Sequence, residues 1–237
     1  MKIISFFIII ILAVGCKSNY QTIGQDKKHK NSSINEDIEW SHTWVVSTNK
    51  YDLPKVLIIG DSHVERYYQN VTDKLINKAY CNKFTTSRSL GDPILIDQLR
   101  AVFNAYKFDI ICFNNGLHGV DYTVKQYSNY IPDVYNLFKK NNSNIKLIWV
   151  NITARRVPKN LTDFDKYNTG IINRNKAIAD FTKAKQIPLI DFYSLSINHM
   201  DYYEPDGIHF NPNGVAEEAN TVTLEILKAI DNLKGYK

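Results

Sequence analysis

From about Trp40 onward, short apolar runs alternate along the chain with amphipathic segments. The apolar runs are rich in β-branched and aromatic residues, as buried strands are, and the amphipathic segments repeat apolar residues every three or four positions, as helices do. The strand-like runs are residues 55–60, 82–87, 108–115, 145–151 and 187–191, and the helix-like segments are residues 63–79, 93–106, 123–141, 168–185 and 212–233. This alternation predicts an α/β domain in three layers (α/β/α), of flavodoxin-like type, with a central parallel five-stranded sheet between two layers of helices.

The start of the chain follows a different pattern. Lys2 precedes an almost entirely apolar run, residues 3–14, and this run is followed by Gly15 and Cys16, as in a bacterial secretory signal. The end of the run resembles a lipobox, in which the cysteine carries lipid; an ordinary signal peptide and an uncleaved anchor are the alternatives. Lipid on Cys16 would anchor the protein to a membrane of the bacterial cell envelope, on the periplasmic or cell-surface side.

Three segments are therefore expected: a lipoprotein signal peptide over residues 1–15, a polar tether over residues 16–39 and the folded domain over residues 40–237. The net charge of +5 is modest, and the basic run at residues 27–30 falls within the tether. A solvated linker is favoured there over a patch for anionic lipid or nucleic acid. No basic surface interleaved with aromatic residues predicts a nucleic-acid partner.

Besides Cys16, the chain has two cysteines, Cys81 and Cys112. Cys112 lies in an apolar strand-like run, where a free cysteine packs as a small hydrophobic residue. Two cysteines do not make a disulfide framework, and no Cys-x-x-Cys pair predicts a metal site. Both cysteines are expected to be structural or incidental. The domain is expected to be a monomer.

The strand at residues 55–60 leads directly into Asp61, Ser62 and His63. Ligands bind at the carboxyl ends of the strands in open α/β sheets, and the helix that follows directs its first N–H groups to the same place. Ser62 could simply cap that helix, as most serines at such a position do. It could instead be a nucleophile, if a base reaches its hydroxyl.

The loop before the last helix supplies a base. Asp206 and His209 are three residues apart in a turn-rich segment, a spacing that lets the carboxylate hold the imidazole in one tautomer. Each motif alone is a weak signal. Their order along the chain, nucleophile, acid and base, requires only that the first and last loops meet at one edge of the sheet. Ser62, Asp206 and His209 are therefore predicted to form a catalytic triad.

These motifs resemble those of the SGNH hydrolases, also called GDSL esterases and lipases, over roughly residues 53–230. The resemblance implies that Ser62 is the nucleophile and that its backbone N–H lies in an oxyanion hole. The segment at residues 89–92 resembles the second conserved sequence motif of the family, which implies that Gly91 is a further N–H donor to the oxyanion.

At the third conserved motif this chain departs from the family pattern. The family usually has Gly-x-Asn-Asp there, with an asparagine that donates a hydrogen bond to the oxyanion. The same spacing in this chain gives Gly116, Leu117, His118 and Gly119. Either His118 replaces the asparagine or Asn114 supplies the amide from the end of the strand, where period-two alternation lets Asn114 and Gly116 face the same way. Whether Asn114, Asn115 or His118 is the third donor stays open.

The resemblance implies a serine esterase that needs neither metal nor cofactor and hydrolyses an O-acyl ester, in particular an O-acetyl ester. No long apolar lid precedes the site, and aromatic and basic residues near the predicted edge suit a carbohydrate: Arg88, Arg155, Arg156, Tyr202 and Tyr203. Asp61, His63 and Arg155 are the candidate substrate contacts. The expected partner is an acylated carbohydrate or another small ester.

Two alternatives remain from the sequence. A glycan O-acyltransferase would use the same triad and pass the acyl group to a sugar hydroxyl in place of water. A metal-dependent phosphoesterase would use Asp61 and His63 as metal ligands, since this pair resembles the start of the calcineurin-like motif. The chain lacks the other motifs of that family and has only six histidines.

Overall fold

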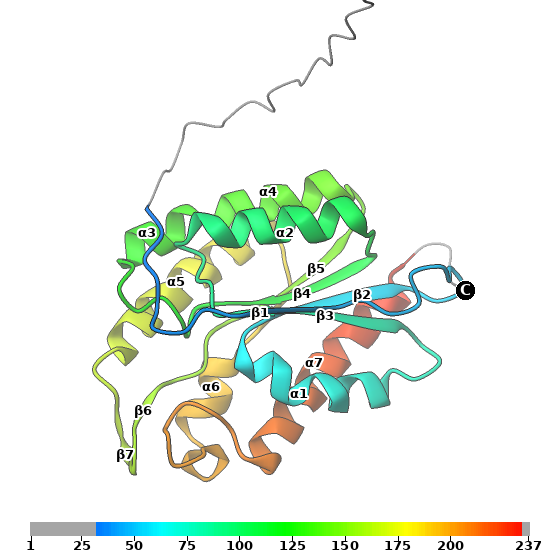
Figure 1. The fold of residues 1–237 in the computed structure, drawn as a ribbon. Coiled ribbons are helices and arrows are strands. Elements are labelled where there is room, and N and C mark those ends of the chain that lie inside the picture. The colour runs from blue at the N-terminus through cyan, green and yellow to red at the C-terminus, as the bar shows by residue number, and fades with distance from the viewer. Residues whose placement is uncertain (1–31, 234–237) are drawn as a thin grey trace, which may run out of the picture.

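The computed structural model describes residues 32–233, so the expected signal peptide, Cys16 and most of the expected tether lie outside the described residues. A six-stranded sheet in the order β1-β3-β2-β4-β5-β8 forms the middle layer (Figure 1). Five strands are parallel: β2 (Lys55–Gly60), β3 (Tyr80–Thr86), β4 (Ile110–Asn114), β5 (Lys146–Val150) and β8 (Leu189–Ile190). The predicted parallel five-stranded sheet is confirmed. The structure adds β1 (Ser41–Trp44), which pairs antiparallel with β3 at the edge.

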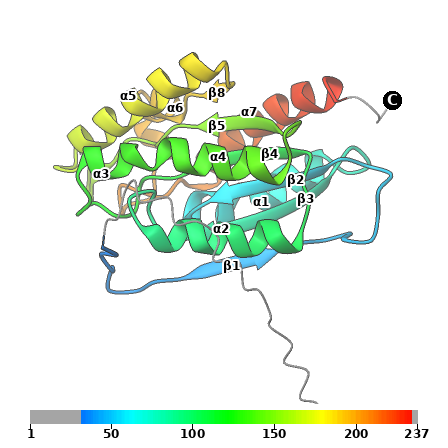
Figure 2. The same ribbon diagram turned by 90° about the horizontal axis from the view of Figure 1, so that it is seen from above.

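Helices cover both faces of the sheet (Figures 1 and 2). One face carries α2 (Pro93–Ala105), α3 (Val124–Asn129), α4 (Ile131–Asn141) and α5 (Asn168–Lys185), and the other carries α1 (Ser62–Lys74), α6 (Phe192–Ile197) and α7 (Pro212–Asp231). The helix expected over residues 123–141 is divided at Tyr130, because Pro132 has no N–H to donate to the preceding turn. Across residues 32–233, no helix combines the length and apolar character needed to span a bilayer.

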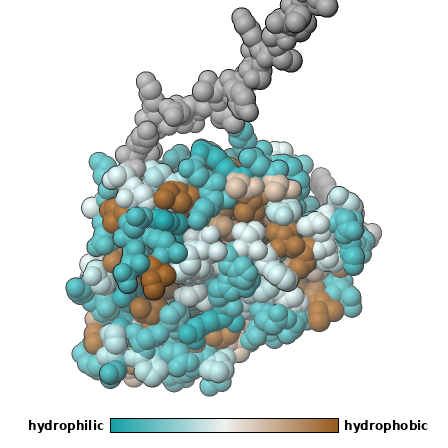
Figure 3. Space-filling model, in the orientation of Figure 1, coloured by the Kyte–Doolittle hydropathy of each residue, from teal (hydrophilic) through white to brown (hydrophobic). Residues whose placement is uncertain are grey.

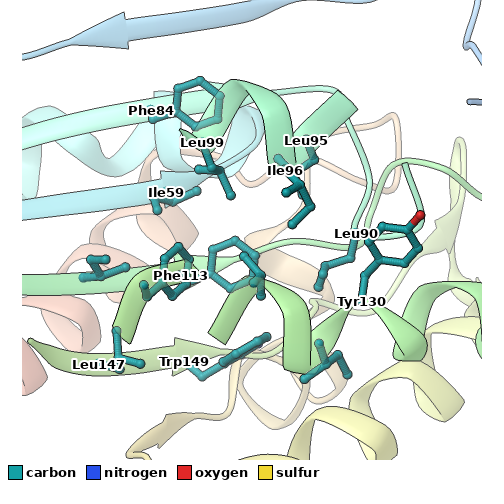
Figure 4. Packing of buried hydrophobic residues seen from close by; sticks show 14 of the residues in the cluster. Ile59, Phe84, Leu90, Leu95, Ile96, Leu99, Phe113, Tyr130, Leu147 and Trp149 are labelled. Carbon is teal, nitrogen blue, oxygen red and sulfur yellow. The ribbon is translucent and has the colours of Figure 1, made fainter. Parts of the chain in front are cut away.

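Alternate residues of each strand point to opposite faces, which builds one apolar core on each side of the sheet. On the α2 and α4 side, the ring of Phe113 packs edge-on against Trp149, with centroids 4.9 Å apart (Figure 4). Its centroid lies 5.4 Å from that of Phe138, also edge-on. On the α1 and α7 side lie Cys81 and Cys112, both buried and free, as expected. The face drawn in Figure 3 is mainly hydrophilic, with small scattered apolar patches.

The last residues of the expected tether are packed against the domain. Ser33 Oγ donates to Asp92 at 2.9 Å, and the backbone N–H of Ile34 donates to Tyr122 Oη at 2.6 Å. Figure 1 shows this segment running down one end of the molecule into β1. The boundary expected at residue 40 therefore falls inside a segment that belongs to the folded body.

The order of the parallel strands in space is second, first, third, fourth and fifth along the chain. The first and third of them, β2 and β4, are neighbours, and the chain leaves them toward opposite faces of the sheet. A crevice forms at such a switch point, and ligands bind in it. Ser62 follows β2 and residues 115–119 follow β4, so both predicted motifs lie at this point.

A further short hairpin, β6 (Arg156–Val157) and β7 (Asn160–Phe164), and the one-turn helix η1 (Met200–Tyr202) complete the described elements. Both lie in long connections that precede α5 and α7. Neither was predicted, because the polar hairpin and the three-residue turn carry no periodic apolar pattern.

Candidate active site

Ser62 lies at the carboxyl end of β2, as the first residue of α1. Asp61 caps the helix, because its Oδ1 accepts a hydrogen bond from the backbone N–H of His63 at 3.0 Å. The strand turns into the helix at Gly60, where a Cβ atom would lie 2.3 Å from Val64 Cγ2. The capping position therefore belongs to Asp61, and the hydroxyl of Ser62 has another partner.

That partner is His209, which lies 147 positions further along the chain. Ser62 Oγ and His209 Nε2 are 2.8 Å apart, and His209 Nδ1 and Asp206 Oδ2 are 2.6 Å apart. The two hydrogen bonds run from hydroxyl to imidazole to carboxylate, which is the arrangement that proton transfer from a serine requires. The structure thus brings the three residues of the predicted triad together.

The carboxylate of Asp206 is held by its own loop. Its Oδ1 accepts hydrogen bonds from the backbone N–H groups of Ile208 and His209, both at 2.9 Å. Burial alone would raise the pKa of Asp206, but the hydrogen bonds from the His209 side chain and from these two N–H groups lower it below its usual value. An ionised Asp206 favours the proton on Nδ1 of the imidazole and leaves Nε2 to accept from Ser62.

The loop that carries Asp206 and His209 is closed by backbone hydrogen bonds. Glu204 N donates to His209 O at 2.7 Å, and Arg156 N donates to Gly207 O at 2.8 Å. Gly207 has a φ of +70°, and a Cβ atom there would lie 2.3 Å from Arg156 O. Glycine is therefore required between the acid and the base, both for the backbone angle and for the close approach of the hairpin.

A cavity of about 540 Å³ opens beside Ser62 and His209. Its walls come from the N-terminal segment, the loop after β4, the region around the β6–β7 hairpin and the loop before α7. The lining residues are Glu36, Trp40, Ser62, Leu117, His118, Val120, Arg155, Tyr167, Ile208 and His209. The hydroxyl and the imidazole thus border a space large enough for a small organic substrate.

No protein-family model matches the chain. A candidate O-acetyltransferase of Staphylococcus aureus is 29% identical over 187 residues, which make up 78% of this chain and 26% of that protein. The chain therefore spans about a quarter of the length of this relative.

Alignment with solved structures identifies the fold. A GDSL-like lipase from Bacteroides thetaiotaomicron aligns with a TM-score of 0.58 and 17% identity, over 75% of this chain and 88% of that chain. A carbohydrate esterase family 3 protein from Talaromyces cellulolyticus aligns with a TM-score of 0.59 and 16% identity, over 77% of this chain and all of that chain. The chain has the SGNH-hydrolase fold.

Within this SGNH-hydrolase fold, Asn114 has a structural position. Its Nδ2 donates to the carbonyl oxygens of Val150 at 3.3 Å and Asn151 at 2.9 Å, which uses both of its N–H groups. Asn114 therefore ties the end of β4 to the end of β5 and has no N–H left for an oxyanion. The prediction that it could supply the third donor is wrong for this arrangement.

Asn115 also supports the backbone. Its Oδ1 accepts from Leu90 N at 2.7 Å, and its Nδ2 donates to Arg88 O at 2.9 Å, so it braces the loop that contains Gly91. Gly91 is buried, and a Cβ atom there would lie 2.7 Å from Tyr122 Cγ. Gly91 is not among the residues that line the cavity beside Ser62, and its role as an N–H donor stays a prediction.

His118 is the remaining candidate for the third oxyanion donor, and it lines the cavity together with Ser62 and His209. Its Nδ1 is 2.7 Å from Glu36 Oε2. Burial alone would lower the pKa of His118, but the hydrogen bond with Glu36 and the charges of nearby carboxylates raise it above its usual value. The ring is therefore well placed to donate a hydrogen bond into the cavity.

Asp61 and His63 do not face the cavity, and their prediction as substrate contacts is wrong. Their exposed fractions are 1% and 2%, because the first turn of α1 directs both side chains inward. His63 Nδ1 lies 2.7 Å from Glu218 Oε1, and His63 Nε2 lies 3.1 Å from Ile208 O. Both ring nitrogens are thus occupied, which leaves neither to serve as the metal ligand of a phosphoesterase.

Among the described residues 32–233, no group of three or more His, Cys, Asp or Glu side chains is arranged to hold a metal ion.

Of the basic and aromatic residues predicted near the edge, only Arg155 lines the cavity. Its guanidinium lies 5.1 Å from the ring centre of Tyr167 and 3.8 Å from the carboxylate of Asp165. Arg156 and Tyr203 instead hold the surrounding backbone: Arg156 is buried and donates to carbonyl groups, and Tyr203 Oη donates to a carbonyl at 2.8 Å.

Two acidic residues of the site were not predicted. Glu36 lies in a polar segment without periodicity, and of its isolated apolar residues Ile34 is partly buried whereas Ile38 is exposed, so the pattern gives no sign of packing. Glu218 lies on the buried face of α7, where a charged residue among apolar neighbours is the sign that it has a partner. Both pair with histidines that the sequence predicted as candidate site residues, His118 and His63.

Proposed function

We propose that this protein is a serine esterase that hydrolyses an O-acyl ester, in particular an O-acetyl ester, on a carbohydrate. The observation that carries the proposal is the hydrogen-bonded series Ser62, His209 and Asp206 at the edge of a cavity in the SGNH-hydrolase fold. Solved structures with this fold include carbohydrate esterase and acetyl xylan esterase examples, which supports the ester class.

In the proposed reaction, the three residues act in turn. His209 Nε2 takes the proton of Ser62 as Oγ attacks the carbonyl carbon, and Asp206 stabilises the resulting imidazolium. The imidazolium then gives its proton to the leaving alcohol oxygen as the C–O bond breaks, which leaves an acyl group on Ser62. Water attacks this acyl group with His209 again as base, and the carboxylic acid leaves with Ser62 restored.

The negatively charged oxygen of the tetrahedral intermediate needs hydrogen-bond donors, both in the first turn of α1 and across the cavity. The N–H of Ser62 belongs to that first turn, whose N–H groups have no acceptor within the helix. Gly91 N–H and a ring N–H of His118 are the further donors that we propose. Loss of one such donor typically lowers the rate by about 10²–10³.

The composition of the cavity wall favours a carbohydrate as the alcohol part of the ester. Trp40 offers an aromatic ring against which a sugar can pack, and Arg155, whose guanidinium lies over the ring of Tyr167, offers a planar set of donors for hydroxyl or carboxylate groups. A second cavity of about 150 Å³ shares Leu117, Val120 and Tyr167 with the first, which extends the space beyond the reacting ester.

Transfer of the acyl group to a sugar hydroxyl is the second candidate. The same triad would form the acyl-enzyme, and a carbohydrate hydroxyl would replace water as the attacking group. The observation that favours this candidate is the similarity to a candidate O-acetyltransferase of Staphylococcus aureus. Release of free acetate, measured against acetylation of an added oligosaccharide, separates the two reactions.

One experiment tests the nucleophile. A serine-directed organophosphonate should label Ser62, and Ser62→Ala should abolish both labelling and turnover of p-nitrophenyl acetate. Ser128→Ala, a serine on α3 whose Oγ donates to a backbone carbonyl, serves as the matched control and should keep both. Equal turnover by the wild type and by Ser62→Ala would overturn the proposed function.

We further propose that the protein acts as a monomer, held by lipid on Cys16 to a membrane of the bacterial cell envelope, on its periplasmic or cell-surface side. The support for the anchor is the sequence pattern that precedes the domain. An anchored enzyme of this kind would meet carbohydrate of the cell envelope.

A further inference from the structure

Glu36 uses both of its carboxylate oxygens on the loop after β4. Its Oε2 lies 2.7 Å from His118 Nδ1, and its Oε1 accepts a hydrogen bond from Gly119 N at 2.8 Å. The N–H of Glu36 itself donates to Glu39 Oε1 at 2.8 Å, which fixes the backbone of the segment. The N-terminal segment therefore holds His118, a residue of the cavity wall, through the carboxylate of Glu36.

The other nitrogen of His118 has no hydrogen-bond partner among the described residues. The ring is held on a second side by Trp40, whose centroid lies 6.0 Å away in an edge-on contact. Because Nδ1 is bound to Glu36 and the ring lines the cavity with Ser62, Nε2 is the nitrogen that a substrate can reach.

The negative charge of Glu36 favours a His118 ring that donates a hydrogen bond from Nε2. Burial would raise the pKa of Glu36, but the hydrogen bonds from His118 and Gly119 lower it below its usual value, so the side chain is a carboxylate. A carboxylate on Nδ1 keeps a proton there and stabilises a second proton on Nε2. The ring can therefore present an N–H to an oxygen that gains negative charge.

The backbone of the loop does not depend on Glu36 alone. The buried guanidinium of Arg174 donates to the carbonyl oxygens of Gly116 at 2.9 Å, His118 at 3.2 Å and Gly119 at 2.7 Å. These bonds come from α5 and hold the loop from its inner side. Removing the Glu36 side chain should therefore free the ring of His118 more than it disturbs the loop.

We propose that Glu36 is a positioning residue, which directs Nε2–H of His118 at the oxyanion of the acyl-transfer step, so that the segment before β1 completes the active site. This inference rests on the proposed function, because it assigns Glu36 a part in the same reaction. It gives the N-terminal segment a role that a passive tether does not have.

Four variants test this inference in the full chain: Glu36→Ala, Glu36→Gln, His118→Ala and the double variant Glu36→Ala/His118→Ala. Asp37→Ala is the matched control, since Asp37 is an exposed carboxylate on the same segment. The measurements are kcat and KM for p-nitrophenyl acetate, with the thermal midpoint of each variant as a check on folding.

His118→Ala should lower kcat by about 10²-fold, as loss of an oxyanion donor does. Glu36→Ala should lower kcat by about tenfold with little change in KM, because only transition-state stabilisation is lost. Glu36→Gln should keep most of this loss near neutral pH, because an amide oxygen can accept from Nδ1 but does not stabilise the second proton that makes Nε2 a donor. The double variant should match His118→Ala, because a positioning residue has no effect once its ring is absent.

Three results would overturn the inference: wild-type kcat in Glu36→Ala, an equal loss in Asp37→Ala, or losses that multiply in the double variant. Losses that multiply would mean that Glu36 only supports the segment. Failure of the proposed function looks different, since the wild type itself would then show no turnover above Ser62→Ala, and that result would remove this role as well.

Discussion

His63 and Glu218 form a buried pair that links two helices to the loop of the catalytic histidine. His63 Nδ1 and Glu218 Oε1 are 2.7 Å apart, and their side chains are 3% and 0% exposed. The second nitrogen of His63 lies 3.1 Å from the carbonyl oxygen of Ile208, the residue before His209. The rings of His63 and His209 are stacked at 6.1 Å. The position of the base is thus tied to α1 and α7 through one imidazole.

This pair predicts a stability that falls with rising pH. Burial alone would lower the pKa of His63, but the Glu218 carboxylate raises it to about 9. A folded-state pKa above the ordinary value of 6.5 gives a stabilisation that is complete below pH 6.5 and is lost as the pH passes 9. We expect the free energy of unfolding to fall by about 3 kcal/mol over this range, measured by urea denaturation.

Glu218→Gln should flatten this dependence, because it removes the charge that holds the proton on His63. Glu217→Gln changes the neighbouring residue of the same helix and should leave the dependence as in the wild type. A wild-type free energy of unfolding that is constant between pH 6.5 and pH 9 would contradict the assignment of a charged His63.

The parallel sheet and the meeting of Ser62 with His209 could be predicted from sequence because both follow from local patterns. Apolar runs mark buried strands wherever they occur, and in a parallel sheet the loops after the strands share one edge. The strand β1 escaped prediction because its four residues are all exposed and mostly polar. An edge strand of this kind carries no apolar face to reveal it.

Side-chain direction could not be predicted in the same way. His118 was a candidate by motif spacing and Asn114 by its place at the end of the strand, and the hydrogen bonds of Asn114 to the β5 end argue against Asn114. Glu36 is 82 residues away from His118, and no period or motif connects the two. Contacts of this kind depend on how loops fold over the edge of the sheet, which the pattern of the chain does not encode.

The structural position of Asn114 can be tested by truncation. Asn114→Ala removes two buried hydrogen bonds, so we expect the free energy of unfolding to fall by about 1–3 kcal/mol. Below the unfolding transition, kcat should change much less than in His118→Ala. A variant with wild-type stability and a loss in kcat of about 10² would instead identify Asn114 as the oxyanion donor.

The anchor that we propose at Cys16 predicts where the protein is found in cells. Lipid on this cysteine should place the full chain in the membrane fraction, and detergent should release it. Cys16→Ser should move the protein to the soluble fraction of the envelope or to the medium. Cys81→Ser changes a buried cysteine of the domain and should leave the distribution unchanged. Equal membrane association of wild type and Cys16→Ser would remove the proposed lipid anchor.

Gly207 controls the distance between acid, base and nucleophile. Gly207→Ala puts a Cβ atom at a φ of +70° and 2.3 Å from Arg156 O, so the loop must shift away from the hairpin. A shift of this kind lengthens the contact between His209 Nε2 and Ser62 Oγ, and a displacement of about 1 Å can cost about 10² in rate. We expect kcat for p-nitrophenyl acetate to fall by about that factor.

Gly170→Ala provides the matched control, because a Cβ atom there meets nothing within 4 Å and the residue lies inside α5. It should keep the activity and stabilise the fold by about 0.5–1 kcal/mol, since alanine loses less backbone freedom than glycine in a helix. If Gly207→Ala instead kept the wild-type kcat, the loop would tolerate the shift, and the spacing of Ser62 and His209 would not depend on the approach of Arg156 to Gly207.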